Sequence, residues 1–93
     1  MPENSEDAIR RRRIKFRAGH RGIREMDLLL GGFAAAHLDE LSGEELSQFE
    51  ALLDAPDHDV LAWISGNAPT PPEYDTALLD RLKSVRLTPE DYN

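Results

Sequence analysis

The apolar residues of one central segment recur with the period of an α-helix, and this pattern constrains the fold more than any other feature of the sequence. The face that they form holds Met26, Leu29, Leu30, Phe33 and His37. No segment shows the alternation of β-branched and polar residues that indicates a strand. Because the chain has only 93 residues, we predict a single all-α domain, a compact irregular bundle of about five helices.

Two helices are predicted in the N-terminal half of the chain. The first spans residues 7–18 and takes Ser5 as its N-cap. The second starts near residue 21 or 22, and the phase of Phe33 and His37 favours a helix that continues past Gly31 and Gly32 over one that stops at Gly31. Each of the two glycines costs about 1 kcal/mol relative to alanine. We therefore expect either a kink at the two glycines or a neighbour that approaches too closely for a side chain.

Three further helices are predicted in the C-terminal half. One begins at the capping box formed by Ser42 and Glu45 and runs to about residue 53. Asp57 is expected to cap the next helix, and Gly66 to end it in the left-handed conformation. The sequence Thr-Pro-Pro-Glu at 70–73 predicts a second capping box and a last helix that runs to about residue 86. The predicted organisation is a flexible N-terminus at residues 1–6, one domain at residues 7–86 and a flexible C-terminal tail at residues 87–93.

The formal net charge is −7, and it is distributed unevenly along the chain. Residues 1–24 contain eight basic and three acidic side chains, a balance of +5. Residues 25–93 contain three basic and fifteen acidic side chains, a balance of −12. A basic arm on an acidic body indicates a partner surface with a charge pattern of its own.

The composition excludes several classes of protein. The chain has no cysteine, so it forms neither disulfides nor thiolate metal sites, which fits a reducing compartment. No stretch approaches the roughly 20 apolar residues of a membrane-spanning helix, and the N-terminus lacks the apolar core of a secretory signal. We therefore expect a protein that does not insert into a membrane.

The stretch HRGIREMDLLL, residues 20–30, carries more charges than a core helix needs and a glycine that a surface helix does not need. On a helical wheel, one face of this segment lies opposite the apolar face. It holds Arg21, Arg24, Glu25 and Leu28, and continues into Gly31, Gly32 and Ala35. This face is either solvated, with an Arg21–Glu25 pair that stabilises the helix by about 0.2–0.5 kcal/mol, or a docking patch that another backbone approaches closely. The stability lost at the glycines favours the docking patch.

Two rival functions stay open at this point. The basic run Arg10–Arg13, with Lys15 and Arg17, could bind nucleic-acid phosphates, although no aromatic platform or zinc-finger spacing accompanies it. A tight, steeply salt-dependent affinity for duplex DNA would favour this nucleic-acid interpretation. The second rival is a generic helical adaptor for an unrelated protein.

The residue types of catalytic and metal sites are present, but their spacing does not fit such sites. His20, His37 and His58 show no metal-ligand spacing. Glu25 and Asp27 stand two residues apart, so on a helix they lie on different faces and do not form an acid–base pair. We expect no catalytic residue, no bound metal and no enzymatic activity.

Residues 21–27 read Arg-Gly-x-x-Glu-x-Asp, which resembles the signature of the SdhE/Sdh5 family of succinate dehydrogenase assembly factors, also called FAD assembly or flavinylation factors. The resemblance continues in the Leu-Ser-x-x-Glu helix start at 41–45. It extends to the pattern Asp-x-x-x-Leu-x-Trp-Ile-x-Gly at 57–66, which a proline-led last helix follows. In all it covers residues 10–86, nearly the whole predicted domain.

The resemblance implies a small five-helix protein of the cytoplasm or, in eukaryotes, of the mitochondrial matrix. It implies binding to the flavoprotein subunit of succinate dehydrogenase, with that of fumarate reductase as a second candidate, and promotion of the covalent attachment of FAD to a histidine of that subunit. On this basis the bond forms within the flavoprotein, and the factor holds a competent arrangement of the flavoprotein's domains. The factor itself is expected to bind no cofactor stably and to be a monomer when free.

The resemblance also implies which residues bind the partner. They are Arg21, Gly22, Glu25 and Asp27, and helix geometry adds their neighbours Arg17, His20 and Arg24. A side chain at Gly22 is expected to clash with the partner, and Asp27 is expected either to contact it or to brace the first helix through Arg17 or Arg13. His20 departs from the family pattern, which often has arginine there, and histidine is only partly charged at neutral pH. Direct FAD binding is not expected, because the chain has no glycine-rich phosphate loop.

Overall fold

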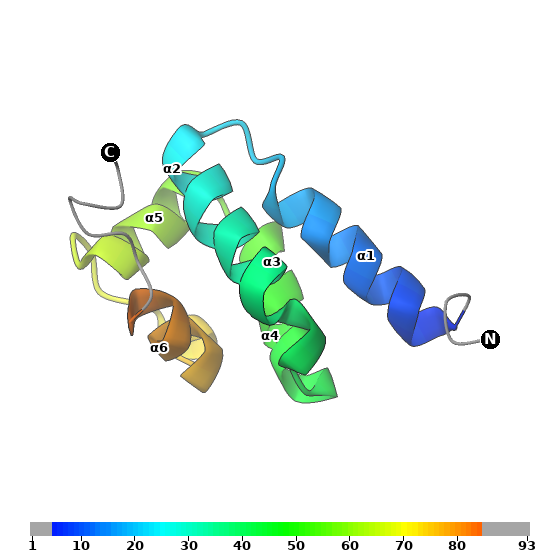
Figure 1. Cartoon of the computed structure of the whole chain (residues 1–93). Coiled ribbons are helices and arrows are strands. Elements are labelled where there is room, and N and C mark those ends of the chain that lie inside the picture. The colour runs from blue at the N-terminus through cyan, green and yellow to red at the C-terminus, as the bar shows by residue number, and fades with distance from the viewer. Residues whose placement is uncertain (1–4, 85–93) are drawn as a thin grey trace.

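The computed structural model describes residues 5–84, in which helices supply the whole framework (Figure 1). The elements are α1 (Glu6–Ala18), α2 (Arg24–Met26), the π-helical turn η2 (Asp27–Gly31), α3 (Gly32–His37), the 3₁₀ turn η3 (Leu38–Glu40), α4 (Gly43–Asp54), α5 (Asp57–Ser65), the 3₁₀ turn η4 (Pro72–Tyr74) and α6 (Ala77–Ser84). Because α2, η2 and α3 follow one another without a break, we treat them as one central segment. The described residues contain no strand, and the predicted all-α class is confirmed.

One apolar core joins these helices. All four apolar residues of the predicted central face are buried, whereas His37 lies half-buried beside Phe33. Helix α1 packs on η2, α3 and α4, while α4 and α5 both contact α6, and α2 contacts α5. Phe49 of α4 meets Phe33 edge to face, with 5.8 Å between the ring centroids. Trp63 of α5 is buried and stacks on Tyr74, with 4.8 Å between the centroids.

Three predicted helix ends are confirmed. The Ser5 side chain accepts the backbone N–H of Ala8 at 3.0 Å. Ser42 and Glu45 form both hydrogen bonds of the capping box, at 3.2 and 3.0 Å. Gly66 takes the left-handed conformation, with φ +84°, and ends α5. Each of these ends depends on residues that lie close together in the chain, so the local sequence is sufficient to specify it.

The central segment differs from the prediction at its start. It begins at Arg24 rather than at residue 21 or 22, because Gly22 has φ +92° and lies outside the helical region. Gly31 shows the close approach expected for the glycine pair, since a Cβ atom there would lie 3.1 Å from the Cα atom of Gly19 at the end of α1. At Gly32 no described atom lies within 4 Å of the position that a Cβ would take, and the helix continues through it.

The predicted last helix is wrong in its first half. Pro71 is extended, with ψ 150°, because a following proline disfavours helical backbone at the residue before it. Only the turn η4 forms there, and the predicted capping box at 70–73 does not. Helix α6 begins at Ala77, where the hydroxyl of Thr76 accepts the N–H of Leu79 at 3.2 Å. The expected helix end near residue 86 and the tail at 87–93 lie outside the described residues.

Candidate docking site

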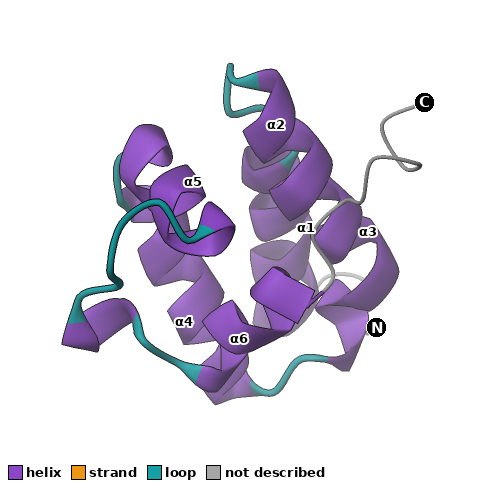
Figure 2. Cartoon of the chain, turned by 90° about the vertical axis from the view of Figure 1, so that its left-hand side faces the viewer, coloured by secondary structure: helices purple, strands orange, loops and turns teal. Residues whose placement is uncertain are grey.

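Residues 21–27, the motif residues, start in the loop between α1 and α2 and continue into the central segment. This loop, called the motif loop below, lies at the upper edge of the molecule in both views (Figure 1, Figure 2). Gly22 is exposed, and no described atom lies within 4 Å of the position that a Cβ would take. Its φ of +92° favours glycine strongly over other residues. The glycine therefore serves the turn of the backbone, and the space around it is accessible.

Arg21 is held by the end of α4 and the start of α5. Its Nε and Nη2 atoms donate to Oδ1 of Asp57 at 3.0 and 2.8 Å, and Nη2 also donates to the Leu53 carbonyl at 2.8 Å. The two side chains of the ion pair are only 14% and 17% exposed. The expected Arg21–Glu25 pair is therefore wrong. Asp57 is also not the N-cap that we predict, because Pro56 takes that place and Asp57 is the first residue of α5.

Asp27, the last motif residue, closes the motif loop from its other side. Its Oδ1 atom accepts the backbone N–H of Arg21 at 2.6 Å. The expected brace from Asp27 to Arg17 or Arg13 of α1 is wrong, because the carboxylate is turned to the loop backbone and Arg17 pairs with Asp54 of α4 at 2.7 Å. The Asp27 carboxylate therefore fixes the backbone of the loop rather than the position of α1.

Arg24 and Glu25 carry the free charges of the motif region. Both residues are exposed, and neither forms an ion pair or a side-chain hydrogen bond with any residue in the range 5–84. Ile23, directly before them, packs against the core and anchors the chain there. Leu28, one turn further along, is 40% exposed. The predicted outward face is thus present at Arg24, Glu25 and Leu28 but not at Arg21.

The strip of small residues that we predict along this face is present only in part. Gly32, Ala35 and Ala36 are exposed. Gly31 instead faces Gly19 at the end of α1, so its missing side chain serves packing within the chain. Another backbone could approach the strip closely only from Gly32 onward.

An exposed aromatic pair stands beside the motif loop. Phe16 of α1 stacks on His20, with 4.1 Å between the ring centroids, and the Nδ1 atom of His20 lies 2.7 Å from the Phe16 carbonyl oxygen. Phe16 is 64% exposed. We do not predict a role for it from the sequence, but its spacing carries the signal: Ile14 and Ala18 are buried, and a residue midway between them on a helix faces away from the core. Aromatic side chains are enriched among the residues that anchor protein contacts.

Much of the basic run of α1 is paired within the chain. Arg10 donates two hydrogen bonds to Glu50, at 2.7 and 3.1 Å, which lower the pKa of Glu50 and raise the pKa of Arg10. Arg11 donates to Asp7 at 2.8 Å and to two carbonyl groups between α3 and α4. These cations hold α1 against the rest of the domain. Binding to nucleic-acid phosphates would therefore have to displace carboxylate and carbonyl partners that are already in place.

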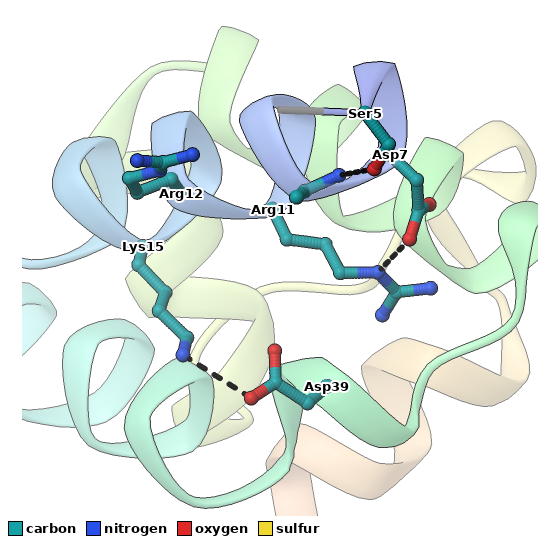
Figure 3. A pocket seen from close by; sticks show the side chains of 7 residues that line it. Ser5, Asp7, Arg11, Arg12, Lys15 and Asp39 are labelled. Carbon is teal, nitrogen blue, oxygen red and sulfur yellow. Dashed lines mark hydrogen bonds and ion pairs between the residues drawn. The ribbon is translucent and has the colours of Figure 1, made fainter. Parts of the chain in front are cut away.

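A hollow of about 570 Å³ lies along α1 beside Asp39 of the turn η3 (Figure 3). It is lined by Ser5, Asp7, Ala8, Arg11, Arg12, Lys15 and Asp39. Two ion pairs join lining residues, Asp7 with Arg11 at 2.8 Å and Lys15 with Asp39 at 3.4 Å. The hollow therefore contains both cations and carboxylates, and it shares no residue with the motif loop.

The histidines of the described range are separate from one another. His37 lies 3.5 Å from a carboxylate oxygen of Glu40, and His58 is exposed. Within residues 5–84, no three metal-ligating side chains gather to hold an ion. None of the helices in that range has the length and hydropathy that crossing a membrane requires.

Known proteins share the sequence of this domain. A family model described as the flavinator of succinate dehydrogenase matches residues 12–86. The chain belongs to this family. The match includes the motif loop and the helices α4 and α5, which hold Arg21 of that loop. The resemblance found in the sequence is therefore confirmed.

Relatives of this chain occur in a bacterium and in insects. It is 47% identical over 75 residues to the FAD assembly factor SdhE of Acetobacter pasteurianus, a match that covers 81% of this chain and 69% of that protein. It is 39% identical over 77 residues to the mitochondrial succinate dehydrogenase assembly factor 2-B of Drosophila ananassae, and 40% identical over 76 residues to factor 2-A of Drosophila erecta. These matches cover 81% and 80% of this chain but only 47% of each insect protein. The chain therefore spans about half the length of the Drosophila relatives.

Proposed function

We propose that this member of the flavinator family is an assembly factor that binds the flavoprotein subunit of succinate dehydrogenase and promotes the covalent attachment of FAD to it. The family description and the names of the relatives support this assignment. The observation that carries it is the region of the motif residues. Arg24 and Glu25 at the start of α2 have no ion-pair partner among residues 5–84, and they follow the exposed Gly22 of the motif loop. Asp27 and Asp57 hold the backbone and the side chain of Arg21 in that loop. Free charges at fixed positions are suited to select one complementary partner surface.

The docking surface that we propose is named the motif surface. It comprises Phe16, His20, Gly22, Arg24, Glu25 and Leu28. Phe16 and Leu28 supply exposed apolar area, which can anchor a protein contact. Arg24 and Glu25 supply charges that fix the orientation of the partner. Gly22 has no side chain, so the backbone of the partner can approach it closely.

The factor is proposed to act as a binding partner and not as a catalyst. FAD is bound by the flavoprotein, and the covalent bond between FAD and a histidine of the flavoprotein forms within that subunit. Binding of the factor would favour the competent arrangement of the flavoprotein's domains, to the extent that the motif surface fits this arrangement better than the others. Binding to the flavoprotein of fumarate reductase, the monomeric free state, the absence of a stably bound cofactor and the cytoplasmic location stay predictions.

Co-expression of the chain with the succinate dehydrogenase flavoprotein of its own organism tests this proposal. Covalently attached flavin is measured as fluorescence of the flavoprotein band in a denaturing gel. We expect the native chain to raise the signal and Arg24→Ala and Glu25→Ala to lower it. Glu44→Ala, which removes an exposed glutamate of α4, is the matched control and should act like the native chain.

Circular dichroism shows whether each of these variants is folded. An unchanged flavin signal with the native chain would contradict the proposed function. A signal that rises equally with the native chain and with both folded motif-surface variants would contradict the docking surface.

A further inference from the structure

We propose that Asp57 is a positioning residue for docking, because it completes a brace that holds the motif loop in its binding conformation. The brace comprises Arg21, Asp27 and Asp57, and none of the three contacts the flavoprotein. This inference rests on the proposed function, since it concerns how the motif surface is presented to that partner. It replaces the expectation from the sequence that Arg21 and Asp27 are themselves partner contacts.

The backbone N–H and the guanidinium of Arg21 both form hydrogen bonds within the chain, without a partner. Its backbone N–H donates to Asp27 at 2.6 Å, and its guanidinium donates three hydrogen bonds, two to Asp57 and one to the Leu53 carbonyl. Among the ion pairs of residues 5–84, the Arg21–Asp57 pair has the least exposed side chains. The motif loop is therefore fixed through its backbone and through its longest side chain at the same residue.

An ion pair with this degree of shielding resists exchange of partners. Transfer of the Arg21 guanidinium to the flavoprotein would leave the Asp57 carboxylate and the Leu53 carbonyl unsatisfied in a position of low exposure. Arg24 and Glu25 carry no such penalty, because both are exposed and unpaired within the described part of the chain. The charges available to the flavoprotein are therefore those of Arg24 and Glu25, which take no part in the brace.

The brace links the motif loop to a distant part of the sequence. Asp57 is the first residue of α5 and Leu53 lies near the end of α4, 36 and 32 positions from Arg21. Without these contacts, the glycine at the turn gives the loop many alternative conformations. Binding would then have to order the loop, and the affinity would fall. The junction of α4 and α5 therefore controls docking through the shape of the motif loop.

A double-mutant cycle on binding separates positioning from contact. The Kd of the purified full chain for the succinate dehydrogenase flavoprotein is measured for Arg21→Ala, Asp57→Ala and the double variant, with circular dichroism as the folding control. If the two residues act as one brace, each single substitution weakens binding about tenfold, and the double substitution weakens it no further. If Arg21 contacts the flavoprotein, Arg21→Ala weakens binding more than Asp57→Ala does. The milder pair Arg21→Lys and Asp57→Asn supports the same cycle if an alanine variant does not fold.

Two further measurements report on the positioning of the motif loop and not only on the stability of the fold. In the free protein, Asp57→Ala should accelerate amide hydrogen exchange at residues 19–24, although residue 57 lies on another helix. The slope of log Kd against log salt concentration should keep its native value in Arg21→Ala and become shallower in Arg24→Ala, which removes a contact charge. Asp39→Ala, which removes the exposed partner of Lys15, is the matched control and leaves the Kd unchanged.

The outcomes distinguish this inference from the proposed function. If the native chain does not bind the flavoprotein, the proposed function and the inference both fail. If the native chain binds and Asp57→Ala leaves the Kd unchanged, the inference alone fails. A shallower salt slope in Arg21→Ala would also overturn it, because that result would place the Arg21 charge in the contact.

Discussion

At the scale of single residues, Gly22 and Gly32 show how differently the backbone depends on two glycines of the same region. Gly22 has φ +92°, a conformation that costs residues with a side chain about 1–2 kcal/mol. Gly32 has φ −64° and open space around it, so nothing within the described chain requires glycine there. The motif glycine is needed for the turn itself, whether or not a partner is bound.

Substitution by alanine tests this difference. We expect Gly22→Ala to lower the free energy of unfolding by about 1–2 kcal/mol. We expect Gly32→Ala to raise it by up to about 1 kcal/mol, because alanine has the higher helix propensity. Urea titration followed by circular dichroism measures both changes. Equal effects at the two positions would contradict the described conformation of the motif loop.

The same scale shows why the roles of Arg21 and Asp27 could not be derived from the sequence. A helical wheel pairs Arg21 with Glu25, four positions along, whereas its partner in the structure, Asp57, lies 36 positions away. Local spacing contains no information on a contact that forms only when α5 packs beside α2. The buried face of the central segment could be predicted, because helical periodicity is itself a local property.

At the scale of elements, α1 and η2 approach each other through glycine. A Cβ atom at Gly31 would lie 3.1 Å from the Cα atom of Gly19, a backbone atom that cannot rotate away. We expect Gly31→Leu to lower the free energy of unfolding by about 1–3 kcal/mol. Gly32→Leu, with the same added volume on the open side, is the control and should not destabilise the fold. Similar urea midpoints for the two variants would contradict the close packing of α1 on η2.

A second element contact, between α1 and α4, links stability to pH. The hydrogen bonds from Arg10 hold the pKa of the Glu50 carboxyl below its usual value. Since the pKa in the folded state lies below that in the unfolded state, the bridge stabilises the fold above the unfolded value of about 4.3. This contribution is lost as the pH falls through the folded-state pKa.

We therefore expect the thermal midpoint of the native chain to fall more steeply from about pH 5 to about pH 3 than that of Glu50→Gln. Glu45, whose pKa is lowered by the backbone of Ser42 and by Arg81, is present in both proteins, so the difference reports on Glu50. Glu44→Gln should follow the native curve. Parallel curves for the native chain and Glu50→Gln would show that the bridge does not contribute.

Element boundaries also show which signals the sequence contains. The start of α4 could be predicted, because Ser42 and Glu45 form a complete local cap. The predicted start of the last helix at 70–73 is wrong, because the prediction used the capping box alone and Pro72 disfavours helical backbone at Pro71. Thr76 caps α6 instead. Neither helical periodicity nor capping residues indicate the π-helical turn at Asp27–Gly31.

At the scale of the whole molecule, the basic N-terminal part of the sequence and the acidic part that follows it contact each other within one domain. The basic helix α1 packs on α4 and forms ion pairs with its carboxylates at Glu50 and Asp54. The basic arm and the acidic body therefore neutralise each other over much of their shared boundary. This arrangement favours recognition through the motif surface over recognition through the basic run.

Duplex DNA tests the rival interpretation of the basic run. We expect the chain to bind a fluorescent duplex of mixed sequence with a Kd weaker than about 10⁻⁴ M at physiological salt, the weak end of non-specific binding. Fluorescence anisotropy at several salt concentrations measures this affinity. Binding that is much tighter and falls steeply with salt would instead support a nucleic-acid function.

Docking of the flavoprotein on the motif surface is tested most directly by amide hydrogen exchange of this chain, with and without the succinate dehydrogenase flavoprotein. We predict that peptides covering residues 16–28 gain protection in the complex. Peptides covering η4 and α6 should exchange as they do in the free protein. Protection confined to η4 and α6, with residues 16–28 unchanged, would contradict docking on the motif surface.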